Sequence, residues 1–168
     1  HAIQVAAAAV ANLPSGRWGD VTVNVGTISG GRATNIVPDS CTVTGEIRAL
    51  CHQDALDRLN EIHSEFVEQA QAVDAKLNFN HTIHITGYRV DTDAPVAQRF
   101  RRACEAVGVS PRFTDTYGGS DCNILSAHGI QGLVVATAMN NCHAVSEYTT
   151  VEELCKAGRL AQALMEKQ

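Results

Sequence analysis

The sequence predicts a mixed α and β protein in two parts, an α+β unit followed by a portion of an α/β domain. Over residues 1–91 the expected elements run helix, strand, strand, helix, strand, which is a βαββαβ sandwich without its first strand. From residue 92 to residue 168, helices alternate with short strands, and the run IQGLVVATAM is apolar enough for a buried parallel strand. The overall fold class is therefore α/β, with a boundary near residues 90–94.

The elements of the first part follow from periodicity and from turn residues. Apolar residues at helical spacing predict two helices, at residues 2–13 and 53–75. Alternating and β-branched runs predict three strands, at residues 21–28, 41–50 and 76–89. Pro14 and Gly16 end the first helix, and the Gly-rich stretch SGGRATNIVPDS joins the first two strands.

The second part reads as helices alternating with strands. Helical patterns predict a helix ending at Gly108, a helix after the GGSD loop and a closing helix, at residues 95–108, within 120–129 and at 151–167. Short apolar or β-branched runs predict two strands, at residues 111–116 and 130–139. The polar stretch NNCHAVSEYTT is then a loop between the second of these strands and the closing helix.

Composition excludes several classes of function. The 168 residues are 45% hydrophobic and carry a net charge of -5 with no basic run, which argues against nucleic acid as a partner. No apolar stretch approaches the roughly 18 residues of a membrane span. Six cysteines without a CxxC pair favour reduced thiols in a cytoplasmic protein. Because His1 opens directly into a helical pattern, we expect the chain to be a piece of a longer polypeptide.

A glycine-containing loop, YGGSDCN, precedes an apolar helical run in the second part. Gly118 and Gly119 tolerate backbone torsions that other residues avoid, and Ser120 or Asp121 is suited to cap the helix that follows. The loop comes after the end of a predicted strand, where α/β proteins bind their ligands. It is either a helix cap alone or a ligand-binding loop, and its position favours the second interpretation.

His143 lies in the polar loop that follows the most apolar predicted strand. A histidine at that position can reach a cleft at the carboxyl edge of a sheet, where it either ligates a metal or only faces solvent. Glu147 is either a supporting partner of His143 or a cap for the last helix. Thr149 or Thr150 with Glu153 resembles a capping box, which is a structural role.

Asn35 and Arg48 stand on either side of a hairpin-like connection in the first part. Arginine is suited to binding a carboxylate through two parallel hydrogen bonds, and an asparagine amide can add another. The structural alternative is a turn asparagine and a surface arginine on a strand.

Taken together, four motifs resemble one family. NVGTISGGRATNIVPD, GEIRAL, YGGSDCN and NCHAVSEYTTVEEL occur in the order and approximate spacing of the di-zinc exopeptidases that include peptidase T, glutamate carboxypeptidase, aminoacylase and diaminopimelate desuccinylase. The sequence is most similar to the peptidase T-like branch, and the resemblance covers essentially the whole chain.

The resemblance implies a division of labour between the two parts. Residues 1–91 correspond to a lid and dimerisation domain without its first strand, and residues 92–168 to the C-terminal portion of the zinc-binding catalytic domain. Asn35 and Arg48 would bind the substrate's carboxylate from the lid, and His143 would be a zinc ligand. In the GGSD loop, Gly118, Gly119 and Ser120 would shape the substrate pocket. Asp121 and Asn123 would support that loop.

The implied function is zinc-dependent hydrolysis of peptide or amide bonds in small peptides, of the tripeptidase or aminopeptidase type, with two zinc ions or other divalent metals. The implied partners are a small peptide or an N-acyl amino acid and a second copy bound through the lid. The remaining zinc ligands and the general base of the family are not in this sequence. We therefore expect no catalytic residue in the chain and no activity from it alone.

Two alternatives remain at this stage. The first is a non-catalytic dimerisation or ligand-binding module of βαββαβ type. The second is an N-acyl-amino-acid amidohydrolase of the same family, because peptidases, aminoacylases and desuccinylases share these motifs.

Overall fold

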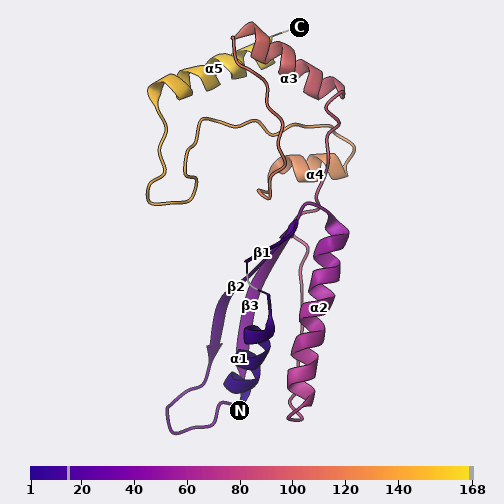
Figure 1. Ribbon diagram of the computed structural model, residues 1–168, viewed down its shortest axis with the longest axis vertical. Helices are drawn as coiled ribbons and strands as arrows, with labels where there is room; N and C mark the ends of the chain where they lie inside the picture. Colours follow the sequence, from indigo (N-terminus) through magenta and orange to yellow (C-terminus); the bar gives the residue numbers. More distant parts are fainter. Residues whose placement is uncertain (15, 167–168) are drawn as a thin grey trace. The chain divides into compact units, whose positions relative to one another are not determined.

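A three-stranded antiparallel sheet with two helices forms the first of two units into which the chain divides (Figure 1). The structure is a computed structural model, and it describes residues 1–14 and 16–166. The two units are His1–Gly87 and Tyr88–Gln168. The lid and catalytic roles that we assigned to residues 1–91 and 92–168 stay predictions.

The sheet contains the two strands that the sequence placed on either side of the Gly-rich connection. Its strands, in spatial order, are β1 (Gly16–Trp18), β2 (Val21–Gly30) and β3 (Cys41–Ala49). The long β2–β3 ladder runs from Val21 opposite Ala49 to Gly30 opposite Cys41. The alternation that predicted the two long strands is confirmed. Strand β1 was missed because three residues are too few to show a period.

Helices α1 (Ala2–Asn12) and α2 (His52–Gln71) pack on the sheet, as predicted (Figure 1). Val21, Val23 and Ile62 form a buried cluster between the sheet and α2. Partly buried apolar side chains surround this cluster, namely Leu13, Ile47, Ala49, Phe66 and Phe79. The mixed class of helices with a small antiparallel sheet is therefore confirmed for this unit.

The third predicted strand, residues 76–89, is not a strand in the structure. The segment packs against the unit, because the Phe79 ring lies 4.7 Å from the His63 ring of α2. A Cβ built on Gly87 would come within 3.1 Å of the Leu50 carbonyl oxygen. Alternation in a sequence predicts which side chains face the core, whereas a strand also needs a hydrogen-bonded partner. The prediction was wrong: the segment pairs with no strand, and Ile83 and Ile85 are 52% and 44% exposed.

The second unit is built around helices α3 (Pro95–Ala106) and α5 (Val151–Met165). Four buried residues form its core, namely Ala103, Cys104, Leu160 and Ala163. The Arg99 guanidinium donates to the Leu164 carbonyl oxygen at 2.6 and 3.1 Å, which ties the two helices together. Both helices were predicted, and the last residue of the predicted closing helix, residue 167, lies outside the described residues.

A short helix, α4 (Asp121–Ala127), follows the GGSD loop as expected, but the two strands predicted beside it are not formed. Residues 111–116 and 130–139 carry no ladder hydrogen bonds, and the described part of this unit contains no strand. Val135 still packs against the α3–α5 core. A parallel strand needs neighbours on its edges. The strand prediction was therefore wrong, and the apolar run is only partly buried, since Ile130, Val134 and Met139 are 54%, 49% and 59% exposed.

Two further features of the described residues concern the cysteines and the helices. All six cysteines are free thiols, of which Cys104 is buried. None of the described helices has the length and apolar character that crossing a membrane requires.

Shortening Ile62 to Ala tests the core of the first unit. We expect the free energy of unfolding to fall by about 2–4 kcal/mol, because the change leaves a cavity beside Val21 and Val23. Trp18, the single tryptophan, lies on β1 and reports this unit in a urea titration followed by fluorescence. Val73→Ala, at a 59% exposed side chain, is the control and should shift it by less than about 0.5 kcal/mol. Equal losses from both variants would contradict the assigned core.

Candidate functional site

Arg48 lies on the polar face of β3, where it already binds a carboxylate of its own strand. Its Nε donates to Glu46 Oε1 at 2.6 Å, and its Nη2 donates to Glu46 Oε2 at 3.2 Å. The two side chains remain 48% and 59% exposed. The hydrogen bond from Arg48 lowers the pKa of Glu46, and the same bond raises the pKa of Arg48. Because the folded-state pKa of Glu46 is lowered, the pair contributes to stability at neutral pH and is lost as the pH falls.

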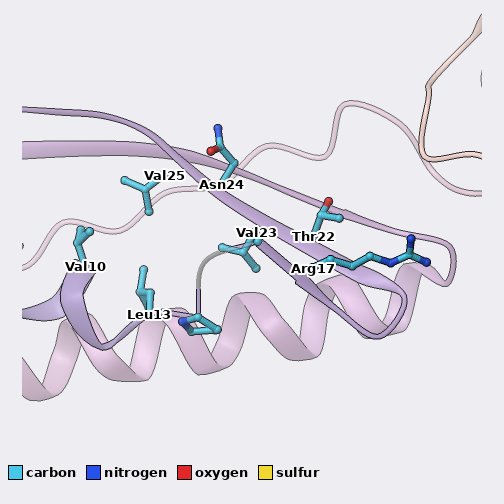
Figure 2. A pocket seen from close by; sticks show the side chains of 9 residues that line it. Val10, Leu13, Arg17, Thr22, Val23, Asn24 and Val25 are labelled. Atoms are coloured by element: carbon cyan, nitrogen blue, oxygen red, sulfur yellow. The ribbon is translucent and has the colours of Figure 1, made fainter. Parts of the chain in front are cut away.

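The polar face around Arg48 contains a residue that sequence reasoning overlooked. In the β2–β3 ladder, Thr22 stands opposite Arg48 and Asn24 stands opposite Glu46. Directly opposed residues of an antiparallel pair share a face. Figure 2 shows Thr22 and Asn24 projecting to one side of β2, with Val23 on the other side, facing the helices. Asn24 therefore offers an amide beside the Glu46–Arg48 pair, and the alternation of VTVNV was the signal for it.

Asn35 lies in the loop between β2 and β3, at the far end of the hairpin from Arg48. The loop is anchored to the start of α1, since the Ala2 N–H donates to the Pro38 carbonyl oxygen at 3.0 Å. Arg48 is seven residues along β3 from Cys41, a rise of about 24 Å. The hairpin therefore keeps Asn35 and Arg48 apart in one chain. The expectation that both residues bind the substrate's carboxylate stays a prediction.

The GGSD loop forms a helix start with its own internal hydrogen bonds. Ser120 is the N-cap of α4, and its N–H donates to Asn123 Oδ1 at 2.9 Å. The Asn123 N–H in turn donates to the Ser120 carbonyl oxygen at 3.0 Å. Asp121 is the first residue of the helix, where a carboxylate suits the positive end of the dipole. Ser120 is thus the cap, and Asn123 supports the backbone of the loop.

The two loop glycines differ from expectation in their torsions. Five other glycines of the described chain have positive φ, and neither Gly118 nor Gly119 is among them. Their backbone is accessible to ordinary residues, so torsional freedom is not what they provide here. A Cβ built on Gly118 would meet only the Thr116 hydroxyl, at 3.4 Å. Gly118 has no side chain and therefore leaves open space beside the backbone.

Tyr88 is a second residue that the sequence did not reveal. Burial and the neighbouring Cys122 thiol raise the pKa of its hydroxyl, while the Ser120 hydroxyl acts in the opposite direction. A Cβ on Gly132 would lie 2.8 Å from Cys122 Sγ, so this glycine leaves room for the thiol. The start of α4 therefore has a tyrosine hydroxyl beside the loop, and no local pattern could have predicted that contact.

His143 lies in an exposed loop whose backbone is under local strain. Its φ is +67°, and Asn141 and Ala138 also have positive φ, at +53° and +65°. The His143 N–H donates to Glu147 Oε2 at 2.7 Å. Non-glycine residues in this region of torsion space persist only where surrounding contacts hold them. Glu147 therefore supports the loop through the backbone of His143, which was one of its two expected roles.

The base of this loop is closed by a bridge and fastened to α5. Asn140 and Tyr148 exchange two backbone hydrogen bonds, at 2.9 and 3.1 Å. Glu153 accepts from the Asn140 amide at 3.1 Å, and its own N–H donates to the Thr150 hydroxyl at 3.2 Å. The predicted capping role of Thr150 with Glu153 is confirmed. The loop thus presents His143 at the tip of a closed turn.

The described residues do not assemble a metal centre. No group of three or more His, Cys, Asp or Glu side chains among them could hold a metal ion. A catalytic zinc site uses about three protein ligands, so His143 by itself does not fit one. We therefore derive no catalytic step through a metal for this chain.

Two hollows lie in the surface, and neither is lined by a residue predicted for the site. The first, of about 400 Å³, lies between the end of α1 and strands β1 and β2, and its walls are mostly apolar (Figure 2). The second, of about 280 Å³, is lined by residues 88–91, Ser126 and residues 129–132. A site at Arg48 or His143 is thus an exposed surface rather than a closed cavity.

The class of protein follows from this architecture. Residues 1–74, which contain the sheet and both of its helices, match the family model of a peptidase dimerisation domain. The resemblance to the peptidase T family of exopeptidases, expected from the motifs, is thereby confirmed for the part that carries Asn35 and Arg48.

Individual relatives extend the likeness to the second unit. The crystal structure of aminopeptidase PepT from Bacillus cereus superposes on 97% of the chain, with a TM-score of 0.82 and 29% identity. The Bacillus subtilis protein YqjE is 26% identical over 99% of the chain, and acetylornithine deacetylase of Myxococcus xanthus is 29% identical over 80%. The chain spans 44%, 45% and 35% of these three proteins, respectively.

Removing the Glu147 carboxylate tests the support of the His143 loop. Glu147→Ala should speed hydrogen exchange of the His143 amide about tenfold, because a charge-assisted hydrogen bond is lost. Glu147→Gln keeps an acceptor oxygen and should change the rate less. The measurement is amide exchange by NMR, with the Tyr148 amide at the bridge as an internal reference. Unchanged exchange in the Ala variant would show that Glu147 does not hold the loop.

Proposed function

We propose that this chain is part of a metallo-exopeptidase that hydrolyses small peptides, of the aminopeptidase or tripeptidase type. The observation that carries the proposal is the likeness to aminopeptidase PepT over 97% of the chain at 29% identity. The peptidase dimerisation domain over residues 1–74 supports it independently. Because the chain spans less than half of that relative, hydrolysis is a property we propose for the whole enzyme.

In this proposal His143 contributes one ligand to a zinc site whose other ligands lie outside the chain. Its exposed position at the tip of a closed loop supports that role, since an imidazole held there is accessible to an incoming ion. The zinc, or another divalent metal, would supply the hydrolytic chemistry when bound. The residues of this chain would orient the substrate around it.

Arg48 would bind the substrate's carboxylate. Its guanidinium engages a carboxylate side-on in the present structure, which is the interaction required. The Asn24 amide, opposite Glu46, is available on the same face. For the other loop we propose that Gly118, Gly119 and Ser120 line the substrate's path and that Asp121 and Asn123 brace them.

The separation of Asn35 from Arg48 favours a dimeric active form. If both residues bind one substrate, they would come from two copies, because Arg48 lies about 24 Å along β3 from Cys41, the end of the strand that the Asn35 loop joins. A dimerisation domain provides for such a pairing. We propose that the Asn35 loop of one subunit reaches the Arg48 site of its partner.

Two alternative functions are also considered. The likeness to acetylornithine deacetylase favours an amidohydrolase acting on N-acyl amino acids, and parallel assays on peptides and on N-acetyl amino acids distinguish the two. A non-catalytic dimerisation module is the remaining alternative. A reading frame that encodes no further zinc ligands upstream of His1 would favour it.

His143→Ala in the whole enzyme tests the metal role. We expect the variant to bind less zinc per subunit than the wild type, because a zinc ligand is removed. Its rate of tripeptide hydrolysis should fall by at least about 100-fold. Zinc content by atomic emission and initial rates with and without a chelator are the measurements. His128→Ala, at the end of α4, is the matched control and should retain both zinc and activity. Chelator-insensitive hydrolysis would exclude the proposed mechanism.

Mixing two inactive variants tests the shared site. Arg48→Ala should raise KM about 10- to 100-fold, because a charge-assisted carboxylate contact is lost, and Asn35→Ala should also lower kcat/KM. Random pairing of the two variants restores one intact site in each mixed dimer, which predicts about a quarter of wild-type activity. Each variant expressed alone is the control. If the mixture is no more active than the separate variants, both residues do not act across the interface.

A further inference from the structure

The carboxylate-binding side of Arg48 has an occupant in the structure. Glu46, two residues earlier on β3, accepts from Nε at 2.6 Å and from Nη2 at 3.2 Å. This is the side-on, two-bond geometry with which an arginine also receives a ligand carboxylate. Glu46 therefore has the chemistry and the position of a substrate carboxylate at the same guanidinium.

The Glu46–Arg48 pair is a poor candidate for a structural element. Its side chains are 59% and 48% exposed, and they lie on the polar face opposite the buried Val23 and the partly buried Ile47. Exposed ion pairs contribute little to stability, because water screens the charges and both side chains lose rotamer freedom. Because the Glu46–Arg48 ion pair is weak in water, another carboxylate can replace Glu46 at a small cost in free energy.

The surroundings of Glu46 allow it to leave Arg48. The side chain faces solvent, so its carboxylate is rehydrated when released. His84 lies near enough for its charge to act on Glu46 and to lower its pKa in the same direction as Arg48 does. Asn24, opposite Glu46 in the ladder, provides an amide close by. The displaced carboxylate thus keeps polar neighbours.

We propose that Glu46 is an exchangeable internal ligand of Arg48, which the carboxylate of a bound peptide replaces. This rests on the proposed role of Arg48 in substrate binding. Because Glu46 competes for the guanidinium, it weakens the binding of every carboxylate ligand by the same factor. A ligand without a carboxylate does not replace Glu46, so the competition lowers the preference for peptides with a free C-terminus over amidated ones.

The competition can be measured on this chain without catalysis. The probes are triglycine and its C-terminal amide, titrated into the protein while the side-chain Nε–Hε resonance of Arg48 is followed by NMR. Glu46→Gln removes the competing charge and keeps the size of the side chain. Glu61→Gln is the matched control, because Glu61 also pairs with an arginine, Arg58, on a different element.

We expect Glu46→Gln to bind triglycine about two- to fivefold more tightly than the wild type, the range set by an exposed ion pair. Glu61→Gln should match the wild type, and triglycinamide should leave the Arg48 resonance unmoved in all three proteins. Equal or weaker binding of triglycine to Glu46→Gln would overturn the proposal, since weaker binding means that Glu46 positions the arginine. A titration in which triglycine moves the Arg48 resonance of neither protein also overturns it.

The whole enzyme separates this result from the proposed function. There Glu46→Gln should lower KM for a free peptide two- to fivefold at unchanged kcat, and should leave an amidated peptide unaffected. If the wild-type enzyme shows no chelator-sensitive hydrolysis, the peptidase proposal is wrong. The titration on this chain would still report on the role of Glu46. Intact hydrolysis with an unchanged KM would overturn the role of Glu46 alone.

Discussion

The pairing of β2 with β3 is the constraint on which the first unit depends. It directs Val21, Val23 and Ile47 to the helices and directs Thr22, Asn24, Glu46 and Arg48 to the opposite face. A slip of one residue would exchange the two faces, burying the charges and exposing the valines. The buried cluster around Ile62 therefore holds the register, and the register places the arginine. The packed core and the exposed position of Arg48 are two consequences of the same ladder.

The hairpin also sets a distance. Because β2 and β3 are long, the loop that joins them and the end that carries Arg48 are far apart, and contacts of the loop with α1 keep it there. A binding site that needs both ends is then incomplete in one copy. In the dimer that we propose, a two-fold operator would bring the loop of one subunit to the arginine of the other. In this proposal, the length of β2 and β3 is the reason that a complete site needs a dimer.

The second unit achieves local order by capping and closure. Ser120 with Asn123 and Thr150 with Glu153 satisfy the exposed N–H groups of two helix starts, and the bridge between Asn140 and Tyr148 closes the loop of His143. Each contact involves residues close in sequence, so each forms without a sheet. Backbone strain at His143 is maintained by Glu147, which binds its N–H. Glu147 thus limits the conformational freedom of the His143 backbone.

The sequence by itself determined what is local: the helices, the strands β2 and β3 from their alternation, and the caps at Ser120 and Thr150, because these depend on neighbours within a few residues. It did not predict that residues 76–89 and 130–139 lack ladder partners and leave apolar side chains such as Ile83 and Val134 exposed. Only the tertiary structure decided that Glu46 occupies Arg48, that Asn24 shares their face and that Asn35 lies at the other end of the hairpin. These facts depend on register and on strand length in space, which no spacing along the chain encodes.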